Sequence, residues 1–149
     1  MTRIAVLNQK GGVGKTTVTL GLASAAIAKG RSTMVVDLDP QASATWALGL
    51  DGPTGLAEAL ASGGSGAAKT AVAASTWSDD LAVVSAGAAL EPWLPEGGPK
   101  TSARALDKAL KGVDANHDLT FLDCPPGLGP ITVNALSTCL LYTSDAADD

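Results

Sequence analysis

The strongest indication of the fold is the segment Gln9-Lys10-Gly11-Gly12-Val13-Gly14-Lys15-Thr16-Thr17. It stands between an apolar run at residues 4–7, which predicts a buried parallel strand, and a helical pattern at residues 15–29, which Gly30 ends. Glycines let the backbone fold closely around an anion, and the amide groups at the start of a helix bind phosphate. The stretch is therefore predicted to be a phosphate-binding loop.

Two side chains of this loop carry chemistry beyond the backbone cradle. We expect Lys15 to contact the β- and γ-phosphates of a nucleoside triphosphate, and the Thr16 hydroxyl to ligate Mg²⁺. The usual pattern G-x-x-x-x-G-K-[ST] fails at its first position, where Gln9 stands, and Lys10 adds a second lysine. The residues expected to bind the nucleotide are Lys10, Gly11, Gly12, Val13, Gly14, Lys15, Thr16 and Thr17.

Aspartates follow two later apolar runs, in VVDLDPQ at residues 35–41 and TFLDCPPG at residues 120–127. Parallel strands bring their carboxyl ends to the sheet edge that carries the phosphate loop. We expect Asp123 to hold Mg²⁺ through water, and one of Asp37 and Asp39 to orient an attacking water. The glycines at 127 and 129 are typical of a switch loop that responds to the γ-phosphate.

Strand patterns alternate with helical patterns along the chain, which predicts an α/β fold: a mostly parallel sheet with helices on both faces. Strands are expected at residues 4–7, 33–36, 81–85 and 119–122; helices are expected at 15–29, 41–48, 54–61, 102–110 and from 131 onward. We expect Thr54 to cap its helix, residues 88–101 to be mainly loop, and all three tryptophans, Trp46, Trp77 and Trp93, to be half-buried.

Composition excludes several classes of protein. The 149 residues are 46% hydrophobic and 17% charged, which excludes a disordered, highly charged chain. No apolar run reaches the ~18–20 residues that span a bilayer. Two cysteines and no export signal indicate a reducing cytoplasm. Three of the 15 acidic residues lie in the last five positions; without them 12 acidic residues face 10 basic ones, so we expect no basic surface for nucleic acid here.

The final eleven residues, CLLYTSDAADD at 139–149, differ in character from the rest. One possible coding string, TGT CTC TTA TAC ACA TCT GAC GCT GCC GAC, resembles the transposon-end adaptor of a common sequencing-library method. We therefore expect residues 139–149 to be an adaptor-derived tail that interrupts the last helix. On this hypothesis the strand at residues 4–7 lacks a neighbour and has an unpaired, aggregation-prone edge.

The motifs KGGVGKTT at 10–17, DLDPQ at 37–41 and FLDCPPGLG at 121–129, continued by ITVNAL at 131–136, together resemble the ParA-type partition ATPases. The resemblance covers residues 3–138. It implies a P-loop NTPase fold with a deviant Walker A motif, in which residues 1–138 are the N-terminal part of the domain, truncated before its C-terminal strands. It also implies Mg²⁺-dependent ATP hydrolysis, with ATP and Mg²⁺ as cofactors, in a dimer that sandwiches ATP and segregates plasmids or chromosomes.

The resemblance also implies a role for each site residue. The signature lysine falls on Lys10, which would reach the partner subunit's phosphates, and the Walker lysine falls on Lys15. The water-positioning aspartate falls on Asp39, with Asp37 as the weaker candidate, while Thr16 and Asp123 hold the metal. Implied partners are a second copy, a ParB-like centromere-binding protein, and non-specific DNA bound by a C-terminal half beyond this chain. We expect no membrane binding and a cytoplasmic, nucleoid-associated location.

Two alternatives stay open at this point. A MinD-like, membrane-cycling ATPase has a similar loop, although the DPQ sequence at residues 39–41 fits partition ATPases better. A truncated nucleotide-binding half with no activity of its own is the second alternative.

Overall fold

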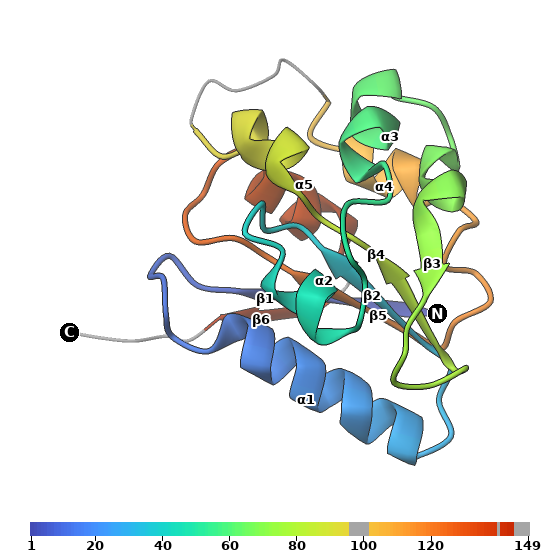
Figure 1. Ribbon diagram of the computed structural model, residues 1–149. Helices are drawn as coiled ribbons and strands as arrows, with labels where there is room; N and C mark the ends of the chain where they lie inside the picture. The colour runs from blue at the N-terminus through green and yellow to red at the C-terminus, as the bar shows by residue number, and fades with distance from the viewer. Residues whose placement is uncertain (96–101, 140, 145–149) are drawn as a thin grey trace.

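The computed structural model describes residues 1–95, 102–139 and 141–144. They form a six-stranded sheet in the order β3-β4-β2-β5-β1-β6 (Figure 1). All neighbouring strands are parallel except β3 and β4, which are antiparallel. The bounds are β1 Thr2–Leu7, β2 Thr33–Asp37, β3 Val72–Ala74, β4 Leu81–Val84, β5 Leu119–Asp123 and β6 Leu141–Ser144. The predicted mostly parallel sheet is confirmed.

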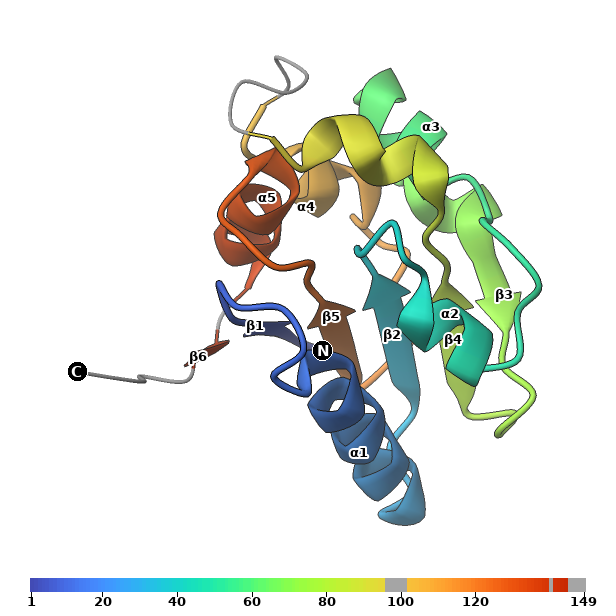
Figure 2. The same ribbon diagram turned by 60° about the vertical axis from the view of Figure 1, so that its left-hand side comes forward.

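Helices cover both faces of this sheet. One face carries α1 and α2, and the other carries α3, α4 and α5 (Figure 2). Successive side chains of a strand point to opposite faces, so Val35 of β2 packs on the α1 side while Met34 and Val36 pack on the other. The bounds are α1 Lys15–Ala28, α2 Ser43–Ala47, α3 Leu56–Ser62, α4 Ala105–Ala109 and α5 Pro130–Thr138, with 3-10 helices η1 Ala67–Ala71 and η2 Ala88–Trp93.

Several local expectations were wrong. Strand β3 was not predicted, and η2 occupies the segment expected to be mainly loop. Helix α3 follows Gly55 in the left-handed region, at φ 98°, so Thr54 does not cap it; the Thr54 hydroxyl instead accepts the Ser85 N–H at 3.0 Å. Of the three tryptophans expected to be half-buried, Trp93 is buried at 4% exposure, and Trp46 and Trp77 are exposed.

Strand β1 does not have the unpaired edge that the sequence predicted. It lies between β5 and β6, and Ile4 is aligned with Leu141 in the outer pair. Helix α5 ends at Thr138, directly before the suspected tail, and residues 141–144 of that tail form β6. Residues 140 and 145–149 lie outside the described part of the chain. Pairing of a strand does not test the origin of its codons, so the adaptor-derived tail stays a prediction.

The guanidinium of Arg3 is buried at the amino-terminal end of β1, at the end of the sheet opposite the phosphate loop, and holds several elements together. It donates to both carboxylate oxygens of Asp114, at 2.6 and 3.1 Å, and to Asp107 Oδ1 and Thr138 Oγ1, each at 2.7 Å. These contacts connect β1 with α4, α5 and the segment that leads into β5. Within the described residues, no helix has the length and hydropathy needed to cross a membrane.

Candidate nucleotide-binding site

The loop between β1 and α1 has the backbone geometry of an anion cradle. Gly12 and Gly14 have φ values of 70° and 90°, in the left-handed region that favours glycine, and Gly14 directly precedes α1. The Lys10 N–H donates to Asn8 Oδ1 at 2.9 Å, which closes the start of the loop. The amino end of a 14-residue helix therefore opens onto the inner side of this loop.

Lys15 folds back across this loop. Its Nζ donates to the backbone oxygen of Lys10 at 3.0 Å. An ammonium group has three N–H donors, so two remain for an anion. The Lys10 side chain is itself exposed and does not line the hollow described below.

Asp123, at the end of β5, accepts hydrogen bonds from two hydroxyls of α1. Thr16 Oγ1 donates to Oδ2 at 2.7 Å and Thr19 Oγ1 donates to Oδ1 at 3.0 Å. Burial raises the pKa of Asp123, and the two hydroxyls oppose that shift. Because the Thr16 proton is directed at Asp123, the oxygen lone pairs of Thr16 are turned away from it and can ligate a cation.

Thr19 is a site residue that the sequence reasoning missed. It lies three positions after Thr16 on α1, and residues at this spacing share a helix face. That spacing was the available signal. Thr19 is fully buried, and its single hydroxyl proton is shared between Asp123 Oδ1 and the Lys15 backbone oxygen, each at 3.0 Å.

Asp37 is fully buried at the end of β2. Its carboxylate accepts the Asp39 N–H at 3.0 Å, the Thr45 N–H at 2.8 Å and the Thr45 hydroxyl at 2.7 Å. Burial raises the pKa of Asp37 to about 6, and these three hydrogen bonds oppose the rise. The Thr45 hydroxyl in turn accepts the Ala86 N–H at 3.0 Å. Asp37 therefore connects β2, α2 and the end of β4.

Asp39 differs from Asp37 in exposure. It is only partly buried, and its Oδ1 accepts the Gln41 N–H at 2.9 Å. It lines a hollow of about 1110 Å³ whose other walls are the phosphate loop, α2 and η2 with the residues that follow it. The lining residues are Gly11, Gly12, Val13, Gly14, Lys15, Thr16, Thr17, Asp39, Pro40, Gln41, Ser43, Glu91, Leu94, Pro95 and Pro126.

The hollow is large enough for a nucleotide, since ligand pockets measure about 300–1,000 Å³. It has a polar end at the loop and an apolar end at Leu94, Pro95 and Pro126. The structure thus brings together Lys15, Thr16 and Asp39 at the hollow. Asp123 lies behind Thr16, and Asp37 lies behind Asp39.

Comparison with known proteins places this geometry in a family. A family described as an AAA domain matches residues 1–143. The chain belongs to this AAA-domain family. The match includes both the phosphate loop and the strand that carries Asp123.

Curated relatives of this AAA domain include chromosome-partitioning proteins. The chromosome-partitioning ATPase Soj of Thermus thermophilus is 38% identical over 140 residues, which are 91% of this chain and 50% of the relative. The chromosome partitioning protein ParA of Caulobacter vibrioides is 38% identical over 139 residues, 90% of this chain and 51% of the relative. The resemblance to ParA-type ATPases is confirmed, and the chain spans about half the length of these relatives.

A solved structure has the same arrangement. The cobyrinic acid a,c-diamide synthase of Mycobacterium smegmatis, crystallised with an ATP analogue and magnesium, superposes with a TM-score of 0.80 at 31% identity. The match covers 97% of this chain and 59% of the synthase. The AAA domain described here therefore has the fold of a nucleotide-binding ATPase.

Proposed function

We propose that this chain is the nucleotide-binding part of a Mg²⁺-dependent ATPase that segregates plasmids or chromosomes. The observation that carries the proposal is the Thr16–Asp123–Lys15 constellation around a loop that opens into a nucleotide-sized hollow. The names of the Soj and ParA relatives support the partition role. The bound ATP analogue and magnesium of the synthase support the choice of ligand.

The donor set fits a triphosphate with its metal. Loop amides and Lys15 would hold the phosphates, and Thr16 would ligate Mg²⁺ with the lone pairs that its bond to Asp123 directs away. Bound Mg²⁺ supplies positive charge that neutralises phosphate oxygens. Asp123 would orient Thr16 through its hydrogen bond and would also hold Mg²⁺ through water, because each of its oxygens keeps a lone pair beyond the hydroxyl bond that it accepts.

Asp39 is the better candidate for the residue that orients the attacking water. It lines the hollow, whereas Asp37 is enclosed and accepts three hydrogen bonds from its own segment. Asp37 then acts as a positioning residue, because its Oδ1 holds the backbone N–H of Asp39.

Lys10 is proposed to act across a dimer. Its side chain is exposed and does not line its own hollow, which suits contact with phosphates bound by a second copy. A lysine supplied by a second subunit would stabilise transition-state charge as an arginine finger does. A ParB-like activator and non-specific DNA are the further proposed partners, and a cytoplasmic, nucleoid-associated location goes with them.

Nucleotide binding by this chain gives the first test. Binding of a fluorescent ATP analogue with Mg²⁺ is measured for the natural chain, for Lys15→Gln and for Lys29→Gln, which changes an exposed lysine directly after the same helix. We expect Lys15→Gln to weaken binding at least tenfold and Lys29→Gln to leave it unchanged. Equal binding by all three proteins, or no effect of Mg²⁺, would contradict the proposed site.

Hydrolysis is tested separately on the same 149-residue chain. We expect the 149-residue chain to bind nucleotide and to hydrolyse it negligibly, because the proposed mechanism needs a second copy. Rapid hydrolysis by a monodisperse, monomeric sample of the chain would contradict the dimer mechanism while leaving the nucleotide site intact.

A further inference from the structure

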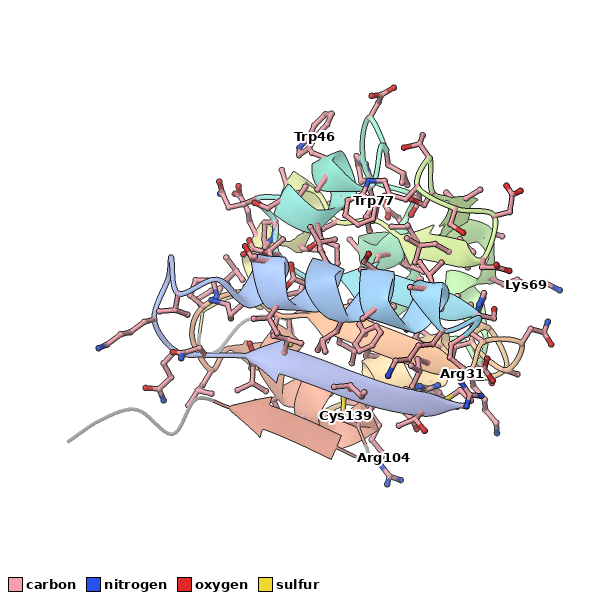
Figure 3. The ribbon with its side chains drawn as sticks, turned by 90° about the horizontal axis from the view of Figure 1, so that it is seen from below. Arg31, Trp46, Lys69, Trp77, Arg104 and Cys139 are labelled. Atoms are coloured by element: carbon pink, nitrogen blue, oxygen red, sulfur yellow. The ribbon has the colours of Figure 1, made fainter. Side chains whose placement is uncertain are left out.

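Two tryptophans lie exposed at the same corner of the molecule. Trp46 on α2 is 57% exposed, and Trp77 in the turn between β3 and β4 is 47% exposed. Figure 3 shows the Trp46 indole pointing outward from α2. Large exposed apolar side chains that gather in one place mark interaction sites.

Hydrogen bonds hold the two supporting segments together. The Leu48 backbone oxygen, at the end of α2, accepts the Thr76 N–H at 3.2 Å and the Ser75 hydroxyl at 3.0 Å. Gly49 has a φ of 83° and packs against Thr76 so closely that a side chain there would overlap it. The Trp77 N–H donates to Ser75 Oγ at 3.1 Å. The two backbone segments that carry Trp46 and Trp77 are therefore held together within the fold.

The charge around these tryptophans is acidic. Asp51, Asp79 and Asp80 are exposed within five positions of one indole or the other. Between residues 32 and 99 the sequence has one basic residue, Lys69. Lys69 precedes β3 while Trp77 follows it, and Figure 3 shows its side chain pointing away from the corner. We call Trp46, Trp77, Asp51, Asp79 and Asp80 the tryptophan corner.

We propose that the tryptophan corner binds a basic, arginine-containing peptide segment of a protein partner. Guanidinium groups stack on indole faces through cation–π attraction, and tryptophan is the best aromatic partner for this contact. The aspartates supply carboxylates that accept paired hydrogen bonds from the same groups. Tryptophan and arginine are also the side chains that contribute most at protein interfaces. The acidic charge opposes a nucleic-acid partner.

The corner does not depend on the proposed ATPase activity. None of its five residues lines the hollow. Peptide binding is therefore measured without nucleotide, and failure of one proposal does not decide the other.

The test uses fluorescein-labelled acetyl-(Arg-Gly-Ala)4-amide and its citrulline counterpart, which keeps the shape of arginine without the charge. Fluorescence anisotropy gives the dissociation constants for the natural chain at low salt. We expect the arginine peptide to bind at least tenfold more tightly than the citrulline peptide. Each of Trp46→Ala and Trp77→Ala should weaken arginine-peptide binding about fivefold, which corresponds to a cation–π contact of about 1 kcal/mol.

Matched variants distinguish specific recognition of the peptide from non-specific hydrophobic or electrostatic binding. Val133→Ala removes an exposed apolar side chain on α5 and should leave binding unchanged, while Asp79→Asn should weaken it and reduce its salt dependence. Equal binding of arginine and citrulline peptides, or natural affinity in both tryptophan variants, overturns the proposal. If Trp46→Ala instead alters the sedimentation coefficient and no peptide binds, the corner joins copies of this chain and the proposal is wrong.

Discussion

Replacing Thr45 with valine tests the hydrogen-bond network behind the site. Valine has nearly the shape of threonine but no hydroxyl, so Thr45→Val removes one donor to the buried Asp37 carboxylate and one acceptor of the Ala86 N–H. A hydrogen bond to a charged group contributes about 1.5–3 kcal/mol, and an unpaired buried N–H costs about 1–3 kcal/mol. We expect the free energy of unfolding to fall by ~3 kcal/mol at pH 8.

The loss should depend on pH. The folded pKa of Asp37, about 6, lies above its unfolded value of 3.8, so its contribution to stability is present below pH 3.8 and is lost as the pH rises through 6. Removing the Thr45 hydroxyl raises the folded pKa further, because that hydroxyl stabilises the charged form. The difference between variant and natural chain should therefore be larger at pH 8 than at pH 5, by about 1.4 kcal/mol for each further unit of pKa shift.

Urea unfolding followed by circular dichroism at pH 5 and pH 8 measures both quantities. Thr70→Val, which changes an exposed threonine in η1, is the matched control and should alter stability by less than about 0.5 kcal/mol. A loss below 1 kcal/mol at pH 8 for Thr45→Val would refute the view that this hydroxyl holds Asp37. A loss of equal size at both pH values would refute the assigned titration.

Three further predictions concern catalysis, the buried ion pair of Arg3 and Asp114, and the tail. In a full-length protein, Asp39→Ala should bind ATP and dimerise but should not hydrolyse ATP, whereas Lys10→Ala should bind ATP but neither dimerise nor hydrolyse it. Phosphate release measures hydrolysis, and sedimentation measures dimerisation. Normal turnover by Asp39→Ala would reject the water-orienting role. Arg3→Met should lower the free energy of unfolding in urea by about 3–5 kcal/mol, because Asp114 is left as a buried, uncompensated charge. A decrease below about 1 kcal/mol would contradict the view that this ion pair stabilises the fold. Sequencing the source DNA without a transposon-based library should show the reading frame continuing past Thr138 with different codons; unchanged codons for residues 139–149 would reject the adaptor-derived tail.

The predictions that succeeded depended on signals within a few residues. The loop at residues 9–17 was recognisable because glycine, lysine and threonine each have a separate physical requirement there. The strands ending at Asp37 and Asp123 were recognisable because a buried parallel strand is apolar throughout. These elements appear in the structure within one or two residues of their predicted bounds.

The features that the sequence reasoning missed depended on how elements pack against one another. Thr45 looks like an ordinary helix residue until the fold brings Asp37 and the N–H of Ala86 to its hydroxyl. Strand β3 has only three residues and forms because β4 offers an edge for antiparallel pairing. Trp93 and Trp46 both lie on short helices, and packing decides that the first is buried and the second exposed.

Sequence patterns predicted the fold class, the phosphate loop and the candidate residues Lys15, Thr16 and Asp123, because these follow from backbone freedom, apolar patterning and side-chain chemistry. The role of Lys10 came from the family resemblance. The resemblance already favoured Asp39 as the water-positioning residue, and the folded structure adds that Asp37 and Asp39 differ in burial. Both stand at the end of one strand, but burial and three hydrogen bonds enclose the first, while the second faces the hollow. A carboxylate's role depends on what surrounds it, and those surroundings come from segments far apart in the chain.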